Sequence, residues 1–372
     1  MPKSRFPVAE ALQPLIDQGE LIGAVTMIAD QKEILQTDTL GYADREAKIP
    51  MREDSLFWIA STTKPVTATA LMMLVDEGKV RLDAPVETYL PDYAGQEVIL
   101  EKTDDRVVLG KPGHPITVHE VLSHTSGLPF FSRLEKVIDG RPLHEAAITY
   151  AMSPLQFQPG TAYLYTNAGI NTAGRILEVV AGQSYESFLQ ERLFKPLGMT
   201  ETTFFPSAKD LGRLAKTYRP TADKSGYAES PIGQMTHPLD GPGRYACPGG
   251  GLFSTGRDVV AFGQLLLGRG VFKGRRFISE ENFSRMTTSH TGSFLFQDGV
   301  EKGYGYGMEV VPPAGTKGVL TGEYGHGGAY SNKLWIDPVT GRVMVFLVQH
   351  AGWINEKGNT AWPAFKAAAS GK

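Results

Sequence analysis

Ser61 and Lys64 are the two residues of this 372-residue sequence whose types and spacing most directly suggest chemistry. They enclose the segment Ser61-Thr62-Thr63-Lys64, and residues at this spacing share one face of a helix. A serine hydroxyl needs a base to become a nucleophile, and a lysine amine with a lowered pKa can serve as that base. The alternative interpretation is a serine that caps a helix, followed by a solvated lysine, because so short a motif often occurs by chance.

A second candidate segment carries Tyr165 and Asn167, in a glycine-containing loop that leads into a predicted helix. A tyrosine close to cations can hold a phenolate or relay a proton. An asparagine side chain can donate to a substrate carbonyl while it accepts from a lysine. A packed aromatic residue and a helix N-cap are the alternative interpretations of these two residues.

The third candidate segment is His326-Gly327-Gly328-Ala329. Small residues on an edge strand let a substrate backbone lie close to the strand. Backbone N–H groups in such a strand can point at an oxyanion that develops during a reaction. A glycine-rich bulge with a surface histidine is the alternative interpretation.

Taken together and in this order, the three segments resemble the serine β-lactamase and penicillin-binding-protein-like superfamily. Within it, they resemble the branch of class C β-lactamases, D,D-peptidases and family VIII carboxylesterases. Further stretches carry the same resemblance, from about residue 8 to residue 350: Leu82-Asp83-Ala84-Pro85-Val86, Val121-Leu122-Ser123-His124-Thr125-Ser126-Gly127-Leu128-Pro129 and Gly249-Gly250-Gly251-Leu252-Phe253-Ser254-Thr255.

The resemblance implies a role for each matched residue. Ser61 would be the nucleophile that forms an acyl-enzyme. Lys64 and Tyr165 would act as a general base pair, with Tyr165 returning the proton to the leaving group. Asn167 would bind Lys64 and a substrate carbonyl. The backbone N–H groups of Ser61 and Ala329 would form the oxyanion hole, and the remaining substrate-binding positions would be His326, Gly327 and Gly328.

Two departures from the family pattern favour an ester substrate. His326 stands where the third motif commonly has lysine, and a histidine with an unperturbed pKa of about 6.5 is mostly neutral near pH 7. We therefore expect His326 to bind anionic substrates more strongly at lower pH. Phe131 stands where class C β-lactamases typically carry a glutamine amide. An aromatic wall suits an apolar acyl or alcohol group, so we predict a carboxylesterase acting on small or medium acyl esters.

Other functions stay open beside this prediction. A β-lactamase or a D,D- or D-amino-acid peptidase would use the same acylation apparatus on a lactam or an amide. A non-catalytic penicillin-binding-like sensor or scaffold would keep the fold without turnover. In every case the predicted partner is a small molecule, and the sequence indicates no oligomeric state.

Motifs of other enzyme classes are missing or imperfect. No serine has glycine at both −2 and +2, which excludes the nucleophile elbow of α/β-hydrolases. His114, His119 and His124 recur every five residues, a spacing that rotates their side chains off a common helix face. Structural roles are the better interpretation of these histidines, so we expect neither a metal nor a cofactor.

Strand-like runs at both ends of the chain and helices between them predict how these residues are positioned. β-Branched or apolar runs cover Leu21–Ala29, Ile34–Tyr42, Gly303–Val311, Tyr324–Asp337 and Arg342–Gln349, and a long helix is expected from Ser61 to about Glu77. This pattern predicts an α/β (α+β) fold, in which one antiparallel sheet from both termini is flanked by helices. Residues 1–80 and 271–372 would form the sheet domain, and residues 81–270 a mostly helical inserted domain.

Composition and charge exclude several classes of protein. Lys and Arg number 37 and Asp and Glu 40, so the net charge of −3 does not suggest a partner that is a nucleic acid or an anionic membrane. No apolar run approaches the roughly 20 residues that a transmembrane helix needs. Cys247 is the single cysteine, so no intramolecular disulfide is possible. The first residues have no apolar signal-peptide core, so a cytoplasmic location is expected as the sequence stands and a periplasmic one if a signal has been removed.

Overall fold

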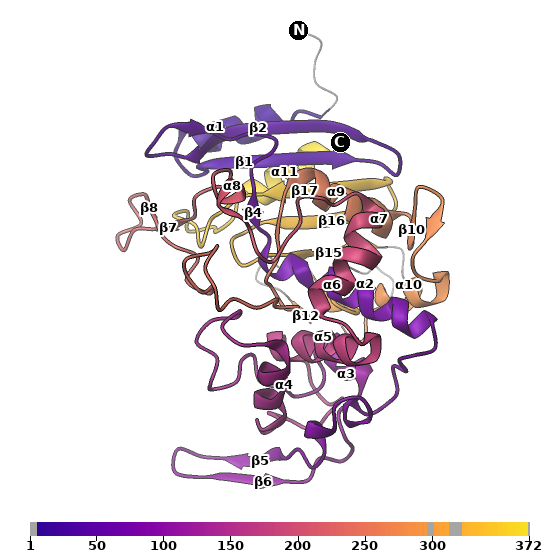
Figure 1. Cartoon of the computed structure of the whole chain (residues 1–372). Helices are drawn as coiled ribbons and strands as arrows, with labels where there is room; N and C mark the ends of the chain where they lie inside the picture. The colour runs from indigo at the N-terminus through magenta and orange to yellow at the C-terminus, as the bar shows by residue number, and fades with distance from the viewer. Residues whose placement is uncertain (1–5, 293, 296–300, 312–321, 371–372) are drawn as a thin grey trace.

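The computed structural model describes residues 6–292, 294–295, 301–311 and 322–370. Its largest element is a nine-stranded sheet that forms the upper layer in Figure 1, with strand order β12-β13-β14-β15-β16-β17-β1-β2-β3. The strands are β1 (Gly23–Ala29), β2 (Ile34–Asp44), β3 (Ile49–Pro50), β12 (Phe294–Leu295), β13 (Glu301–Tyr304), β14 (Glu309–Val310), β15 (Tyr324–Gly327), β16 (Lys333–Asp337) and β17 (Arg342–Leu347).

The two ends of the chain meet in the middle of this sheet. β1 pairs antiparallel with β17, so that Val25 faces Leu347 and Ala29 faces Val343. On its other side β1 pairs with β2. The prediction of one antiparallel sheet built from both termini is confirmed.

Helices cover both faces of the sheet, and every residue of β1 is buried. Because side chains alternate across a strand, Val25 and Met27 join one hydrophobic cluster whereas Ala24 and Ile28 join another. The smaller cluster lies under α1 (Val8–Asp17) and α11 (Ala361–Ala369), which contact each other. On the opposite face, α9 (Gly256–Leu267) packs against β1, β16 and β17.

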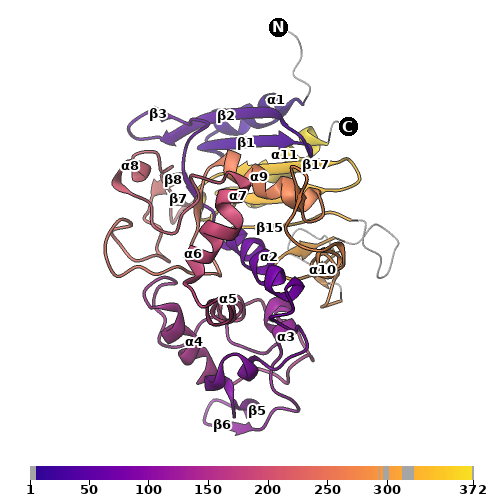
Figure 2. The same ribbon diagram turned by 45° about the vertical axis from the view of Figure 1, so that its right-hand side comes forward.

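The segment between the two halves of the sheet is mostly helical. Helix α2 (Thr63–Asp76) follows the short 3-10 helix η1 (Ala60–Thr62) and lies between the sheet and the lower helices in both views (Figures 1 and 2). The other helices are α3 (Val118–Ser123), α4 (Leu143–Ala151), α5 (Asn167–Ala181), α6 (Tyr185–Leu189), α7 (Lys195–Leu197), α8 (Ala208–Leu211) and α10 (Glu280–Met286), with the 3-10 turns η2 (Val86–Thr88) and η3 (Pro91–Tyr93) and the π-helical turn η4 (Gln190–Phe194).

Four small antiparallel ribbons complete the described part of the chain. They pair β4 (Phe57–Trp58) with β9 (Phe253–Ser254), β5 (Val98–Lys102) with β6 (Val107–Gly110), β7 (Tyr218–Pro220) with β8 (Tyr227–Glu229), and β10 (Val271–Phe272) with β11 (Arg275–Arg276). The β4–β9 ribbon matters for the site, because it joins the segment before Ser61 to the segment after Gly249.

Two of the predicted strand runs are each divided in two. Tyr324–Asp337 forms β15 and β16, joined by a turn in which Ser331 has a φ of +67°. Gly303–Val311 spans the end of β13 and all of β14, because Gly307 turns the chain with a φ of +71°. In both cases a left-handed residue reverses the chain, which an apolar pattern does not reveal.

The position of β15 also differs from the prediction of an edge strand. β15 lies inside the sheet, with β14 on one side and β16 on the other. Its pairing with β14 covers only Tyr324 and Gly325, however, so the His326–Gly327 end has no β14 partner among the described residues.

The division into a sheet domain and an inserted domain stays a prediction, and α9 bears on where the boundary would fall. This helix belongs to the middle segment of the sequence but packs on the sheet. Within the described part of the chain, no helix combines the length and the apolar character needed to cross a membrane.

Candidate active site

Ser61 lies in η1, the 3-10 turn that leads into α2, immediately after a strained residue. Ala60 is buried and has a φ of +46°, in the left-handed region that residues with a Cβ rarely occupy. Its carbonyl accepts a hydrogen bond of 2.7 Å from the Thr63 hydroxyl, and Ile59 N–H donates to Leu252 O at 2.9 Å. These contacts hold the turn that leaves the Ser61 side chain partly exposed while the helix behind it is buried.

The Lys64 side chain is fully buried and surrounded by hydrogen-bond acceptors. Its Nζ lies 3.0 Å from Ser61 Oγ, 2.7 Å from Asn167 Oδ1 and 2.5 Å from Gly249 O. Removal from water disfavours the charged ammonium, and this desolvation lowers the pKa of Lys64 from 10.5 to about 7. Near neutral pH a large fraction of Lys64 is therefore a neutral amine.

The three acceptors decide where the lone pair of that neutral amine points. A neutral amine has two N–H donors, and the oxygens of Asn167 and Gly249 can only accept from Lys64 at these positions. When both N–H groups are donated to them, the nitrogen lone pair is left facing Ser61 Oγ, 3.0 Å away. This is the arrangement in which an amine can take a hydroxyl proton.

Tyr165 approaches the same hydroxyl from the loop before α5. It forms a side-chain hydrogen bond with Ser61, and burial raises the pKa of the Tyr165 phenol well above its ordinary value. Lys64 Nζ lies 4.7 Å from the centre of the Tyr165 ring. Of the two predicted roles, a raised phenol pKa favours the relay of a proton over a phenolate, and the division of the base role between Lys64 and Tyr165 stays a prediction.

The Asn167 side chain can accept from Lys64 because the neighbouring Thr166, and not Asn167, caps the helix. Thr166 is the N-cap of α5, and its hydroxyl accepts from Gly169 N–H at 2.9 Å. The alternative interpretation of Asn167 as the cap is therefore wrong. Thr166 N–H also donates to His124 Nδ1 at 3.2 Å, which fixes the backbone between Tyr165 and Asn167 and gives His124 a structural role.

Backbone groups of the turn after β15 face the Ser61 turn. A Cβ on Gly328 would lie 2.6 Å from Ile59 O and 2.3 Å from Asn332 Oδ1, so only glycine allows this approach. Ala329 follows at an exposed position, and its N–H donates to no acceptor in the described residues. An N–H group available at this place is what the predicted oxyanion hole requires.

Asn332 is a positioning residue that the sequence did not indicate. Its side chain is fully buried, donates to Trp58 O at 3.1 Å and accepts from the Thr62 hydroxyl at 3.1 Å. Its backbone carbonyl accepts from Gly328 N–H at 2.8 Å. Asn332 therefore connects the glycine turn to Trp58 and Thr62, which lie on either side of Ser61 and are distant from Asn332 in the sequence.

His326 is buried rather than presented to solvent. Its Nδ1 lies 2.6 Å from Gly327 O, which can only accept, so Nδ1 carries the proton and Nε2 accepts from the Tyr304 hydroxyl at 3.0 Å. Burial lowers the pKa of His326 to about 3, and the charge of Lys64 adds to this effect. The lowered pKa favours a neutral ring, so we expect no cation at this position near neutral pH, in contrast to the expectation from the sequence.

The aromatic wall near the site consists of two residues with different surroundings. Phe131, the predicted wall, is half-buried and packs against the cluster that contains Ala60 and Ile138. Phe130 is 40% exposed, and its ring centre lies 6.0 Å from that of Tyr165. The sequence motif placed an aromatic here, but only the fold shows that Phe130 is the ring beside Tyr165.

The remaining histidines do not form a common site. His119 Nδ1 lies 2.8 Å from the Tyr306 hydroxyl, and His114 Nδ1 lies 2.9 Å from Pro115 O. His124 contacts Thr166 instead. The three histidines therefore have separate partners, as the interpretation of structural roles predicts.

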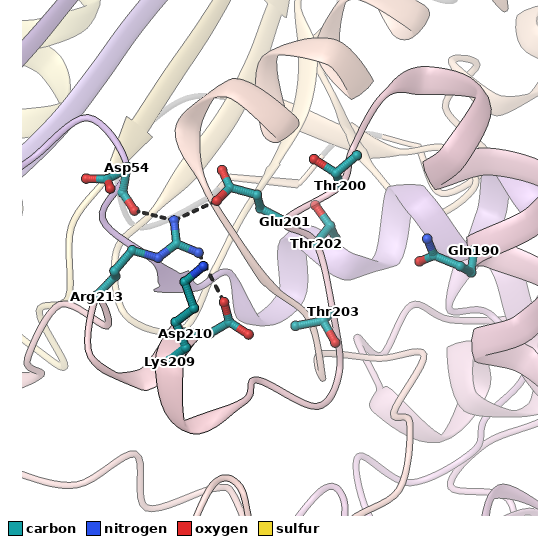
Figure 3. A pocket seen from close by; sticks show the side chains of 9 residues that line it. All are labelled: Asp54, Gln190, Thr200, Glu201, Thr202, Thr203, Lys209, Asp210 and Arg213. Atoms are coloured by element: carbon teal, nitrogen blue, oxygen red, sulfur yellow. Dashed lines mark hydrogen bonds and ion pairs between the residues drawn. The ribbon is translucent and has the colours of Figure 1, made fainter.

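A polar cavity of about 580 Å³ lies away from Ser61 (Figure 3). Arg213 in its wall donates to Asp54 O at 3.0 Å, to Glu201 at 2.6 Å and to Asp210 at 3.1 Å. Its guanidinium is thus already paired within the protein. The cavity is lined by Asp54, Gln190, Thr200, Glu201, Thr202, Thr203, Lys209, Asp210 and Arg213, and it includes none of the predicted site residues.

Comparisons with known proteins identify the family and the fold of the chain. The sequence matches the Beta-lactamase family over residues 8–369. Protein Rv1367c of Mycobacterium tuberculosis is 33% identical, covering 91% of this chain and 88% of that protein. Esterase EstB of Burkholderia gladioli is 29% identical, covering 92% and 91%. The solved structure of EstCE1, a hydrolase with promiscuous acyltransferase activity, superposes with a TM-score of 0.79 at 24% identity, over 97% of both chains.

Proposed function

The chain belongs to the Beta-lactamase family, and on this premise we propose that it is a serine hydrolase that forms an acyl-enzyme on Ser61 and acts on small or medium neutral acyl esters. The observation that carries the proposal is the position of the buried Lys64 amine, 3.0 Å from Ser61 Oγ, with its two N–H groups directed at Asn167 and Gly249. A solvated lysine beside a capping serine would have no such acceptors.

The preference for a neutral ester comes from the groups around Ser61. His326 occupies the third motif as a neutral ring, bonded to Tyr304 and Gly327, so it supplies no charge to a substrate carboxylate. Phe130 offers an exposed aromatic face beside Tyr165. An apolar acyl or alcohol group gains more from such surroundings than a carboxylate does.

The proposed reaction has two balanced stages. Ser61 Oγ attacks the ester carbonyl carbon while its proton passes to Lys64 Nζ, and the N–H groups of Ser61 and Ala329 receive the oxyanion. The bond from the carbonyl carbon to the alcohol oxygen breaks, and that oxygen takes the phenolic proton of Tyr165 while Tyr165 takes the proton held by Lys64, so Lys64 is neutral again. Water then attacks the acyl carbonyl carbon and gives a proton to Lys64. The bond from that carbon to Ser61 Oγ breaks, the proton returns to Oγ, and the acid is released.

A rate comparison tests the proposal. We expect p-nitrophenyl acetate and p-nitrophenyl butyrate to be hydrolysed faster than nitrocefin and D-alanine p-nitroanilide. A fluorophosphonate probe should label the wild-type protein at one equivalent, and Ser61→Ala should lose both the labelling and the hydrolysis.

Each alternative function gives a different result in these assays. Faster turnover of nitrocefin would identify a β-lactamase, and faster turnover of the D-alanine anilide a peptidase. A folded wild-type protein that neither labels nor turns over any substrate would be a binding protein, which would overturn the proposal.

A further inference from the structure

Gly249, whose carbonyl accepts from Lys64, also donates its N–H to a buried asparagine, Asn171. Gly249 N–H donates to Asn171 Oδ1 at 2.8 Å, and the carbonyl oxygen of the same residue lies 2.5 Å from Lys64 Nζ. A Cβ on Gly249 would lie 3.0 Å from Asn167 Oδ1 and 3.1 Å from Asn171 Oδ1. Two asparagines one turn apart on α5 therefore hold Lys64, one directly and the other through Gly249.

The hydrogen-bond chain continues beyond Asn171 to the loop that carries Phe130. Asn171 Nδ2 donates to the Tyr150 hydroxyl at 2.8 Å, and that hydroxyl donates to the Glu135 carboxylate. Glu135 also accepts from Ser132 N–H at 3.0 Å. Because Tyr150 and Asn171 are almost fully buried, each depends on these partners for its polar groups.

We propose that Asn171 is a positioning residue for the proton acceptor of the site: by holding the Gly249 N–H, it fixes the backbone that carries the Gly249 carbonyl and so aims the Lys64 lone pair at Ser61. This role rests on the proposed function, because it concerns the same base and nucleophile. Asn171 Oδ1 accepts from Gly249 N–H at 2.8 Å and from Cys247 Sγ at 3.5 Å, and Asn171 has no hydrogen bond to Ser61 or Lys64 among the described residues. Its effect on Lys64 is therefore indirect, and Gly249 is the shorter of the two routes.

The charged and titratable groups near Lys64 make a pH profile a direct test. Cys247, Tyr165, His124 and His326 face it, and no carboxylate pairs with it among the described residues. Both histidines have lowered pKa values and the Tyr165 phenol a raised one, so none of them titrates near pH 7. The acidic limb of activity in this range would therefore report Lys64 itself.

Loss of the hydrogen bond to the Gly249 N–H should change both the maximal rate and the pH at which the acidic limb has its midpoint. A carbonyl oxygen close to Nζ is the negative end of a dipole, which favours the ammonium over the amine. When Asn171→Leu removes the anchor, we expect the acidic limb to move to lower pH by at least about half a pH unit. The maximal rate should fall by about 10- to 100-fold, because the lone pair is no longer aimed.

The experiment measures the rate of fluorophosphonate labelling of Ser61 as a function of pH. The variants are Asn171→Leu and Tyr150→Phe, which removes the acceptor of Asn171 Nδ2 and should act in the same direction but more weakly. Thr172→Val is the matched control: Thr172 is buried on the same helix and bonds Ala168 and Tyr93, not Gly249. Circular dichroism confirms that each variant is folded.

The outcomes separate this inference from the proposed function. The positioning role is supported if the pH midpoint of the acidic limb is lower in Asn171→Leu and unchanged in Thr172→Val. It is overturned if the midpoint in Asn171→Leu is unchanged or higher, or if the midpoint of the control shifts by the same amount. If Asn171→Leu does not fold, Tyr150→Phe decides by the same criteria. A wild-type protein that is not labelled at any pH contradicts the proposed function instead.

Discussion

Asn167 Oδ1 accepts a hydrogen bond of 2.7 Å from Lys64 Nζ, across 103 residues of sequence. The bond joins α5 to α2, and the Tyr165 phenol enters the site from the loop that precedes the same α5. The proposed nucleophile and base thus come from the continuous segment of η1 and α2, whereas the groups proposed to orient the base and return the proton come from α5 and the loop before it. The site is complete only when these helices are docked.

Burial of Lys64 has a cost that should appear in the stability of the protein. Its pKa falls from 10.5 in the unfolded chain to about 7 in the folded protein, which corresponds to roughly 5 kcal/mol at about 1.4 kcal/mol per pKa unit. The folded state bears the full cost below pH 7. The cost decreases as pH rises from 7 to 10.5, because only the unfolded state holds the proton there. Lys64→Met should therefore stabilise the protein most at pH 6.

Urea denaturation at pH 6 and pH 9.5 measures this effect. We expect the difference in unfolding free energy between Lys64→Met and wild type to shrink markedly at the higher pH. A difference of equal size at both pH values would mean that Lys64 keeps its ordinary pKa in the folded protein.

Removal of the Tyr165 hydroxyl should reduce turnover without loss of the fold. Tyr165→Phe keeps the ring beside Lys64 and Phe130 but removes the hydrogen bond to Ser61. Loss of a positioned proton donor typically reduces the rate by about 10²- to 10⁴-fold, and we expect kcat for p-nitrophenyl butyrate to fall in this range. Tyr163→Phe, two residues earlier, is the control and should stay within a few-fold of wild type. Equal effects of the two changes would argue against a proton-transfer role.

The two neighbouring phenylalanines should respond differently to truncation. Phe130→Ala removes an exposed ring beside Tyr165, so KM for p-nitrophenyl butyrate should rise more than KM for p-nitrophenyl acetate. Phe131→Ala removes a packed side chain and should mainly lower the unfolding free energy, by roughly 1–3 kcal/mol. Steady-state kinetics and urea denaturation of both variants separate the two roles. The assignment fails if Phe131→Ala changes acyl-chain preference and Phe130→Ala does not.

Selectivity against anionic esters should not depend on pH between 5 and 8. His326 keeps a neutral ring because its pKa is lowered to about 3, far below this range. The ratio of KM for a carboxylate-bearing p-nitrophenyl ester to KM for p-nitrophenyl butyrate should therefore stay flat. A ratio that falls toward pH 5 with a midpoint near 6 would show that the histidine becomes charged. Measurement in both substrates cancels the effect of Lys64 protonation on the acylation step, which they share.

The sequence predicted those parts of the site that short motifs encode. The structure brings together Ser61, Lys64, Tyr165 and Asn167, as the spacing within each segment and the family resemblance led us to expect. The strands at both ends of the chain were also predictable, because β-branched alternation is a local property. The catalytic roles of the four site residues stay predictions.

Features that depend on contacts between distant segments were not predictable. Asn332 and Asn171 look like ordinary polar residues in the sequence, and their importance follows from partners such as Trp58 and Gly249. The lowered pKa of His326 depends on burial and on the charge of Lys64, which is distant in sequence. A sequence pattern reports neither the burial of a side chain nor which distant group accepts its proton.

The pairing of β1 with β17 also affects how the protein is made. Synthesis begins at the N-terminus, so β1 and β2 leave the ribosome long before Arg342–Leu347, the inner neighbour of β1. Until then an apolar strand has an open edge, which invites aggregation or capture by a chaperone. The proposed nucleophile and base are synthesised early, but the turn with Ala329 and the strand that completes the sheet are synthesised late. The proposed site is therefore incomplete until translation is nearly finished, and we expect a chain without β16 and β17 to be inactive.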